Sequence, residues 1–427
     1  MKRKRNRFKK IERDAALRAL NGNGCCPGLP TLPHCHNNEK NRNDDDFDDS
    51  NQNARLGHKY GVVPYGNILM SFLEGNTRRV NGSESRSHPD QVRHLGLGNM
   101  LCLNDEQLLI ILSYMGGSTL GRVTCCSRFL YVAGHYEEIW RDLTLEKENS
   151  NPDGIDFWYS WKDTYVHHFN KGMKNRLVKG IESTVMKGSG TWPHMPITMQ
   201  GVYSDVLYRP WLCRNFPLPA LCANNVPVEE YQTLTTERFL RDYEEKNLPV
   251  VVKGASSSWP ALKTWTDTDD LVRRTSDVIF RATSGAAPLP ASFFMESYSR
   301  YCSCITAEEA PLYLFDRTFA QNCPSLHDDY FCALKKSCPY LNENAEHGHD
   351  LFSVLGKDRR PDYRWIIAGP LRSGSSFHID PNATHAWNAP IVGRKRWIFY
   401  PPGSTPPGVY PSPSGDDVIM PISLGEW

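Results

Sequence analysis

The sequence predicts an α+β protein in which a small helical domain precedes a unit built mainly of short strands. Three observations support this prediction. Apolar residues recur at helical spacing through residues 95–147, a capped amphipathic segment begins at Thr235, and short apolar runs separated by glycine and proline follow it. A helix followed by many short strands is typical of an α+β unit built on a sheet sandwich or barrel.

The overall composition is that of a globular chain with room for a sizeable core. It has 427 residues, of which 40% are hydrophobic, and a net charge of +1, so it gives no overall electrostatic reason to bind nucleic acid. No run of about 18 apolar residues occurs, so no membrane span is predicted. The 13 cysteines are scattered and include adjacent pairs, which favours reduced thiols in a reducing compartment.

Residues 1–94 are predicted to form a basic N-terminus and a disordered linker. The start, "MKRKRNRFKK", is a basic cluster of the kind that importins or nucleic acid recognise, and a solvated charge run remains the alternative. We therefore predict a nuclear location. From Asn21 to Ser87 there are too few apolar positions to offset the entropy of ordering. The same absence of a foldable framework argues against a zinc site at Cys25, Cys26, His34, Cys35 and His36.

Residues 95–147 are predicted to form three packed helices. Their apolar stripes are Leu108, Ile111 and Leu112; Val123, Cys126, Phe129 and Leu130; and Ile139, Trp140 and Leu143. This stretch resembles an F-box, whose pattern is occupied by Leu120, Val123, Cys126, Phe129, Trp140 and Leu143. The proline that usually follows the first leucine of that pattern is absent, and Cys102-Leu103-Asn104 stands in its place. A generic helical packing domain remains the alternative.

The next two segments are a connection, residues 148–230, and a second domain, residues 231–427. In the second domain, Thr235 precedes a capped helix, and Pro249–Val252 is predicted to form a buried strand. Further strands are predicted at Val278–Ala282, Leu312–Phe315, Arg364–Ala368, Phe377–Asp380 and Arg396–Tyr400.

His378 and Asp380 are the candidate metal ligands. Residues two apart on a strand point to the same face, so this imidazole and this carboxylate are expected to enter one cavity. Lys395, in phase with Trp397 and Phe399, is expected to be a buried cation that needs an anion. Tyr313, Ser375 and Asn388 offer neutral hydrogen-bonding groups for the same pocket. A polar turn at His378 and a plain edge-strand lysine at Lys395 remain the alternatives.

A longer stretch carries a family resemblance. The segment "DYRWIIAGPLRSGSSFHIDPNATHAWNAPIVGRKRWIFYPP" resembles the jumonji-C double-stranded β-helix of the cupin class, particularly the branch described as arginine demethylase and lysyl hydroxylase, once called the phosphatidylserine receptor. With the lead-in "FLRDYEEKNLPVVVKGA" and "PLYLFD", the resemblance covers about Tyr231 to Pro402. The family's second metal-binding histidine lies beyond Trp427, so we expect the domain to be incomplete at its C-terminus.

The resemblance implies a site and two hypotheses of function. His378 and Asp380 would bind Fe(II), and Lys395 with Tyr313 would bind the far carboxylate of 2-oxoglutarate. Ser375 and Asn388 would line the pocket of this cosubstrate, which reacts with O2. The chain would then hydroxylate or demethylate Arg or Lys in histones or RNA-associated proteins. Alternatively, it is a non-catalytic adaptor whose F-box-like helices dock a Skp-type subunit of a cullin ubiquitin ligase.

Overall fold

The computed structural model describes residues 61–77, 91–149, 153–169, 197–215, 225–304, 308–337, 355–381, 384–413 and 418–427. The chain divides into two compact units: unit 1 comprises residues 1–143 and 160–209, and unit 2 comprises residues 144–159 and 210–427. The segment 148–230 contributes to both units instead of only connecting them. The basic cluster and the Cys and His residues near the N-terminus lie outside the described residues.

Unit 1 is mainly helical. Its elements are β1 (Val62–Gly66), α2 (Ile68–Thr77), α3 (Gln91–Leu97), η3 (Gly98–Cys102), α4 (Asp105–Ser113), α5 (Gly117–Val123), α6 (Arg128–Gly134), α8 (Trp161–Phe169), β2 (Ile197–Tyr203) and the first parts of α7 (Glu137–Glu148) and α10 (Asp205–Asn215). Within the described ranges, no single helix is long and apolar enough to cross a membrane. The helical segments Gln91–Cys102 and Asp105–Ser113 meet the length and composition criteria only when taken together, and the chain bends by 73° between them.

The predicted helical domain is present, with more and shorter helices than expected. Leu120, Phe129 and Trp140 are almost completely buried in its core. The prediction that Val123 to Leu130 lie on one helix was wrong. Helix α5 ends at Val123, and Ser127 caps the start of α6 by accepting a hydrogen bond from the Leu130 amide. Ser127 favours a cap over a helix interior because its hydroxyl competes for backbone groups.

The predicted disorder up to residue 94 was wrong for one segment. Val62–Gly66 forms β1 and pairs in parallel with β2, and α2 follows it. The polar composition around this segment hid it, because the strand that pairs with it lies more than a hundred residues later in the chain. The composition of a segment indicates how much apolar surface the segment itself can bury, and it does not indicate whether a distant strand pairs with it.

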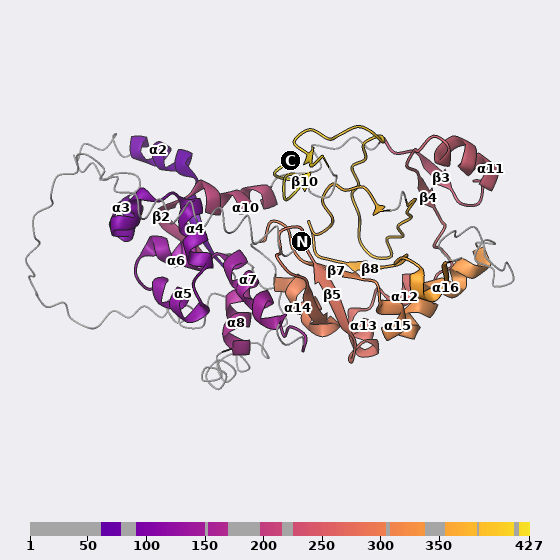
Figure 1. Cartoon of the computed structure of the whole chain (residues 1–427), viewed down its shortest axis with the longest axis horizontal. Coiled ribbons are helices and arrows are strands. Elements are labelled where there is room, and N and C mark those ends of the chain that lie inside the picture. The colour runs from indigo at the N-terminus through magenta and orange to yellow at the C-terminus, as the bar shows by residue number, and fades with distance from the viewer. Residues whose placement is uncertain are drawn as a thin grey trace, which may run out of the picture. The chain divides into compact units, whose positions relative to one another are not determined.

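Unit 2 contains a 4-stranded antiparallel sheet with the order β6-β5-β7-β8 (Figure 1). The strands are β5 (Ile279–Thr283), β6 (Ala291–Phe294), β7 (Tyr313–Asp316) and β8 (Ile366–Ala368), which confirms three predicted strands to within two residues at each end. In β5 the side chains alternate: Phe280 and Ala282 are fully buried while their neighbours on each side are more exposed. Helix α14 (Met295–Cys304) covers the buried face with Tyr298 and Tyr301, which contact the Phe293 ring.

The remaining parts of unit 2 are small elements. They are β3 (Val228–Glu230), α11 (Thr236–Phe239), η5 (Leu240–Glu244), β4 (Val251–Lys253), α12 (Ala261–Thr264), α13 (Thr268–Arg274), α15 (Phe319–Asn322), α16 (Pro324–Ser337), α17 (Gly356–Arg359), β9 (Tyr410–Pro411) and β10 (Val418–Ile419). The predicted cap is confirmed, because the Thr235 hydroxyl accepts a hydrogen bond from the Arg238 amide at 3.2 Å. The prediction that Pro249–Val252 is buried was wrong, since β4 lies in a sheet of two described strands, paired with β3, and keeps Val251 exposed.

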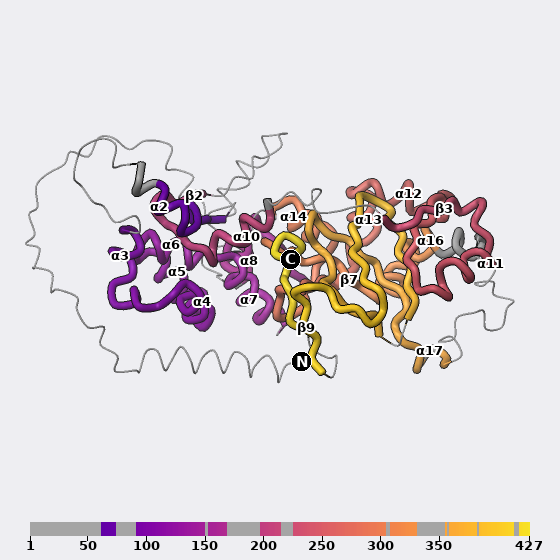
Figure 2. Tube along the Cα trace, turned by 90° about the horizontal axis from the view of Figure 1, so that it is seen from above, coloured from indigo at the N-terminus to yellow at the C-terminus, as the bar shows by residue number. Residues whose placement is uncertain are grey.

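Two predicted strands are absent from the described residues. Phe377–Asp380 and Arg396–Tyr400 run as irregular chain, which lies in the late, yellow part of the trace in Figure 2. Both runs have strand-like composition, but no described strand pairs with them, and Ile379 is 93% exposed. A strand needs a ladder partner, so β-type residues alone do not form one.

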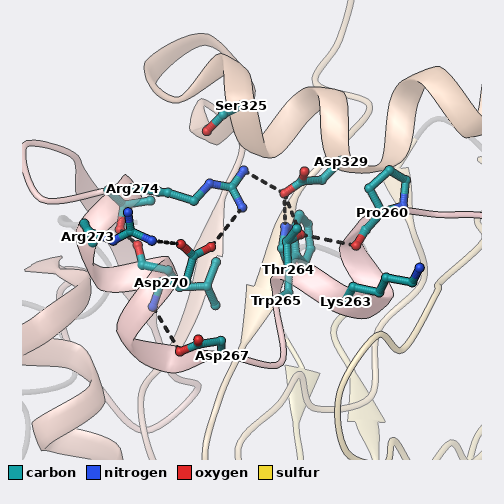
Figure 3. Close-up of polar contacts among 12 residues, drawn as sticks. Pro260, Lys263, Thr264, Trp265, Asp267, Asp270, Arg273, Arg274, Ser325 and Asp329 are labelled. Atoms are coloured by element: carbon teal, nitrogen blue, oxygen red, sulfur yellow. Dashed lines mark hydrogen bonds and ion pairs between the residues drawn. The ribbon is translucent and has the colours of Figure 1, made fainter.

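Asp329 of α16 ties this helix to the short helices α12 and α13 of unit 2 (Figure 3). Its carboxylate accepts hydrogen bonds from the Thr264 hydroxyl at 2.9 Å, from Trp265 Nε1 at 2.7 Å and from Arg274 Nη2 at 2.8 Å. The oxygen shared by these donors is Oδ2, so one buried charged atom holds the end of α12, residue Trp265 and the end of α13 against α16.

We predict that Asp329→Asn lowers the free energy of unfolding by about 1–3 kcal/mol, because the ion pair with Arg274 is lost while the side chain keeps its shape. The change is measured as a shift of the urea midpoint. Asp328→Asn is the matched control on the same helix; its carboxylate is exposed, so it should cost no more than about 0.5 kcal/mol. Equal costs for the two variants would contradict the prediction.

Candidate metal centre

His378 and Asp380 lie together on the irregular segment that follows the turn after β8. His378 Nε2 is 3.2 Å from Asp380 Oδ1, and the two side chains are 53% and 41% exposed. The predicted strand that was to align them does not form, yet the two side chains still meet. The pair therefore presents one imidazole nitrogen and one carboxylate oxygen to a common point that is open to solvent.

The backbone fixes the orientation of the His378 ring. Its Nδ1 lies 2.7 Å from the carbonyl oxygen of Ser376, and only a protonated Nδ1 can hydrogen-bond to a carbonyl. In the neutral ring Nε2 then carries a lone pair directed at Asp380, so two acceptors face each other. A cation bound between Nε2 and the carboxylate, or a second proton on the ring, would give both of these acceptor atoms a partner. Metal-binding histidines are oriented in this way by a hydrogen bond from their other nitrogen.

Tyr313 and Ser375 form a second contact, and Ser375 lies three residues before His378 along the chain. Tyr313 begins β7 and is buried, and its phenol oxygen lies 2.8 Å from Ser375 Oγ. Burial raises the pKa of Tyr313, and the contact with Ser375 lowers it in part, so the phenol keeps its proton at neutral pH. Gly369 allows this approach, because a Cβ there would lie 2.8 Å from the Tyr313 Cβ.

Lys395 and Asn388 do not join the other four residues. In the part of the chain that the structure describes, neither forms a hydrogen bond or ion pair with His378, Asp380 or the Tyr313 contact. The prediction of a buried Lys395 was wrong: the residue is exposed on the irregular segment and its ammonium lies 5.8 Å from the centre of the Trp397 ring. Partial desolvation still lowers its pKa, and a nearby carboxylate would raise it.

Two structural contributions were not predicted from the sequence. The Ser376 carbonyl that orients His378 is a backbone group, so no side-chain pattern reports it. Trp387 packs edge-to-face on Trp259 with 6.0 Å between ring centres, which anchors the segment that carries Asn388. Ser376 and Trp387 lie within the quoted segment that carries the family resemblance, and the tryptophan next to Asn388 was the available signal.

The donor set at this site has two members. Across the described residues, no group of three or more His, Cys, Asp and Glu side chains is placed to hold a metal ion. One imidazole and one carboxylate are two of the three protein ligands in the two-histidine, one-carboxylate arrangement that suits non-haem Fe(II).

Comparison with known proteins extends this picture. Residues 236–423 match the family model described as cupin-like domain. The chain is 37% identical over 376 residues to the arginine-specific demethylase JMJ22 of Arabidopsis thaliana, which covers 88% of this chain and 64% of that protein. It is 34% identical over 171 residues to the bifunctional arginine demethylase and lysyl-hydroxylase psr-1 of Caenorhabditis elegans, which covers 40% of each.

A third relative is more distant. The chain is 25% identical over 193 residues to the 2-oxoglutarate and iron-dependent oxygenase JMJD4 of Gallus gallus, covering 41% of this chain and 43% of that protein. The chain thus spans less than two thirds of the length of each of these curated relatives.

Proposed function

We propose that this chain, which carries a cupin-like domain of the JmjC type at residues 236–423, is an oxygenase that uses Fe(II), 2-oxoglutarate and O2. Its substrates are arginine or lysine side chains of proteins such as histones or RNA-associated proteins. The observation that carries the proposal is the approach of His378 Nε2 to Asp380 Oδ1 at 3.2 Å, with the ring oriented by the Ser376 carbonyl. The names of the relatives support the reaction class.

The residues present fit a metal ion. His378 and Asp380 would hold it, because their facing acceptor atoms lack a donor between them when the ring is neutral. When bound, Fe(II) with 2-oxoglutarate and O2 supplies the oxidation of a substrate C–H bond, with 2-oxoglutarate converted to succinate and CO2. The contribution of the chain is to hold the ring, the carboxylate and the reactants in place.

The remaining site residues have roles in binding the cosubstrate. Tyr313 keeps its proton and can donate its O–H to a carboxylate, with Ser375 fixing the phenol. Lys395 offers an ammonium whose pKa is lowered by desolvation, so the negative charge of a bound carboxylate would stabilise its protonated form. Asn388 offers an amide on the segment anchored by Trp387. These assignments imply a pocket whose selectivity for a dicarboxylate depends on Lys395.

We predict that Lys395→Ala raises the KM for 2-oxoglutarate about a hundredfold, equivalent to about 2.8 kcal/mol of lost binding. The measurement is succinate release over a range of 2-oxoglutarate concentrations. Arg394→Ala is the matched control, since it removes an equal charge from the neighbouring exposed position and should leave KM within about twofold. If both variants raise KM equally, Lys395 acts only through general charge and its assignment fails.

The type of product distinguishes the two reactions of this class. Hydroxylation of an N-methyl group releases formaldehyde, whereas hydroxylation of a carbon leaves a stable alcohol. We would offer methylated arginine peptides and unmethylated lysine peptides and record formaldehyde and the gain of one oxygen atom by mass. 2-Oxoglutarate turnover with neither product on any peptide would contradict the proposed substrate class.

A second candidate function rests on unit 1. We propose that residues 95–147 act as an F-box-like adaptor that docks a Skp-type subunit of a cullin ubiquitin ligase. Leu120, Phe129 and Trp140, which occupy the F-box pattern, are buried as a core should be, while Leu95 and Tyr114 are exposed apolar side chains on the same domain. The test is co-purification with a Skp-type subunit, compared between the wild type and Tyr114→Asp. Failure of the wild type to bind would overturn this role.

We also propose a nuclear location, supported by the basic residues at the start of the chain. Fusion of residues 1–10 to a fluorescent reporter should direct it to the nucleus. A reporter that stays evenly distributed would remove this support.

A further inference from the structure

His135 and Lys162 meet at the junction of two helices in unit 1. His135 follows the last residue of α6 and is 4% exposed, and Lys162 lies in the first turn of α8. Lys162 Nζ lies 2.6 Å from His135 Nε2. Both of these nitrogen atoms can carry a proton, so the contact depends on how many protons the two side chains hold.

The backbone decides which nitrogen of the His135 ring carries the proton. His135 Nδ1 lies 2.6 Å from the carbonyl oxygen of Tyr131, and a carbonyl can only accept, so Nδ1 is protonated. In the neutral ring Nε2 then has a lone pair, which accepts a hydrogen bond from the Lys162 ammonium. The Tyr131 ring lies against the imidazole, with 4.3 Å between ring centres, and helps to fix its orientation.

A further proton on this pair is unfavourable. Because Nδ1 already donates to the backbone, the proton would enter on Nε2 and point at the ammonium 2.6 Å away, so two like charges would face each other in a partly buried place. Burial also lowers the pKa of Lys162. Three groups offset part of this effect: Asp163, ionised Cys125 and Glu137. The contact therefore holds one positive charge and resists a second.

The carboxylates near this contact also hold the start of α8. Asp163 accepts a hydrogen bond from the Ser160 hydroxyl at 2.9 Å, and its amide donates to the same hydroxyl oxygen at 3.0 Å. Glu137, in the first turn of α7, accepts a hydrogen bond from the Trp161 amide at 2.7 Å. The first turn of α8 is thus attached to α7 through Glu137 and to the end of α6 through Lys162, so loss of the second attachment loosens this turn.

We propose that the contact of His135 with Lys162 is a pH-sensitive latch, which holds the first turn of α8 on the end of α6 at neutral pH and opens when His135 takes up a proton. Above the ordinary titration range of histidine, near about pH 6.5, the ring is neutral in the folded and the unfolded chain, and the latch has its full strength. As the pH falls below that range, the unfolded chain binds a proton that the folded contact resists, so the stability of this part of unit 1 decreases. The latch does not depend on the proposed oxygenase activity.

The test is hydrogen–deuterium exchange of the full chain, followed by mass spectrometry of peptides from α6 and α8, between about pH 7.5 and about pH 5.5. Each exchange rate is divided by the intrinsic rate at the same pH, so that only the opening equilibrium remains. We expect the opening of α8 in the wild type to increase as the pH falls, by up to about tenfold per pH unit, which is the limit for one proton. His135→Gln keeps a donor for the Tyr131 carbonyl and an acceptor for Lys162 without a titrating ring, so it should remove this increase.

Two further variants complete the test. Lys162→Met removes the opposing charge, so the increase on acidification should shrink, and this variant decides the outcome if His135→Gln fails to fold. His94→Gln is the matched control, because His94 is an exposed histidine on α3 of the same unit, and it should behave as the wild type does. A wild-type opening that does not change with pH, or one that changes equally in the wild type and in either latch variant, would overturn the proposal.

Discussion

Replacing His378 by alanine is expected to abolish 2-oxoglutarate turnover and to weaken Fe(II) binding by about a hundredfold or more. The variant removes the imidazole that faces Asp380 at 3.2 Å, one of the two proposed ligands. Loss of groups that merely orient metal ligands already costs about 10- to 100-fold in metal affinity. Anaerobic equilibrium dialysis measures Fe(II) affinity, and succinate release measures turnover.

His385→Ala is the control for this variant. His385 is a nearby exposed histidine on the same irregular part of the chain, and it is not paired with a carboxylate in the described residues. It should bind Fe(II) and turn over 2-oxoglutarate as the wild type does. Turnover that survives the loss of His378, or that falls equally in both variants, would remove His378 from the metal centre and with it the proposed function.

The second large effect is expected on stability. Trp140→Ala should lower the free energy of unfolding of unit 1 by about 3–5 kcal/mol, as truncation of a buried aromatic residue does. Trp140 is 1% exposed, donates Nε1–H to the Gly134 carbonyl at 2.8 Å, and meets the Tyr165 ring edge-to-face at 5.4 Å between centres. Lys162 Nζ lies 5.5 Å from the centre of the Trp140 ring, so a cation–π contact is also lost.

Denaturation followed by circular dichroism measures this effect. A domain has only about 5–15 kcal/mol of stability, so the variant should be partly unfolded or show a much lower midpoint. Trp140→Phe is the control: it keeps an aromatic ring but leaves the Gly134 carbonyl without its donor, and should cost less than the alanine variant. An unchanged midpoint for Trp140→Ala would show that residues 95–147 do not form the core described above.

Local signals in the sequence predicted the elements that depend on local interactions. The Thr235 cap is one such element, because a cap is decided by a hydroxyl and an amide three residues apart. The strands β5, β7 and β8 are others, because each is a short run of apolar and aromatic residues bounded by turn residues, and β5 also alternates buried and exposed positions. The candidate metal pair was also predictable, since two residues so close in sequence meet in many backbone conformations.

The sequence by itself thus predicted the α+β class, a helical domain ahead of a unit with short strands, and the pair His378 and Asp380. Only the tertiary structure decided which β-type runs become strands: Phe377–Asp380 and Arg396–Tyr400 find no partner among the described strands, whereas Val62–Gly66 finds one in β2. It also decided the orientation of His378 by a backbone carbonyl. Strand pairing depends on groups distant in sequence, which local composition does not specify, and the contact of His378 with the Ser376 carbonyl depends on the path of the backbone, which no side-chain pattern reports.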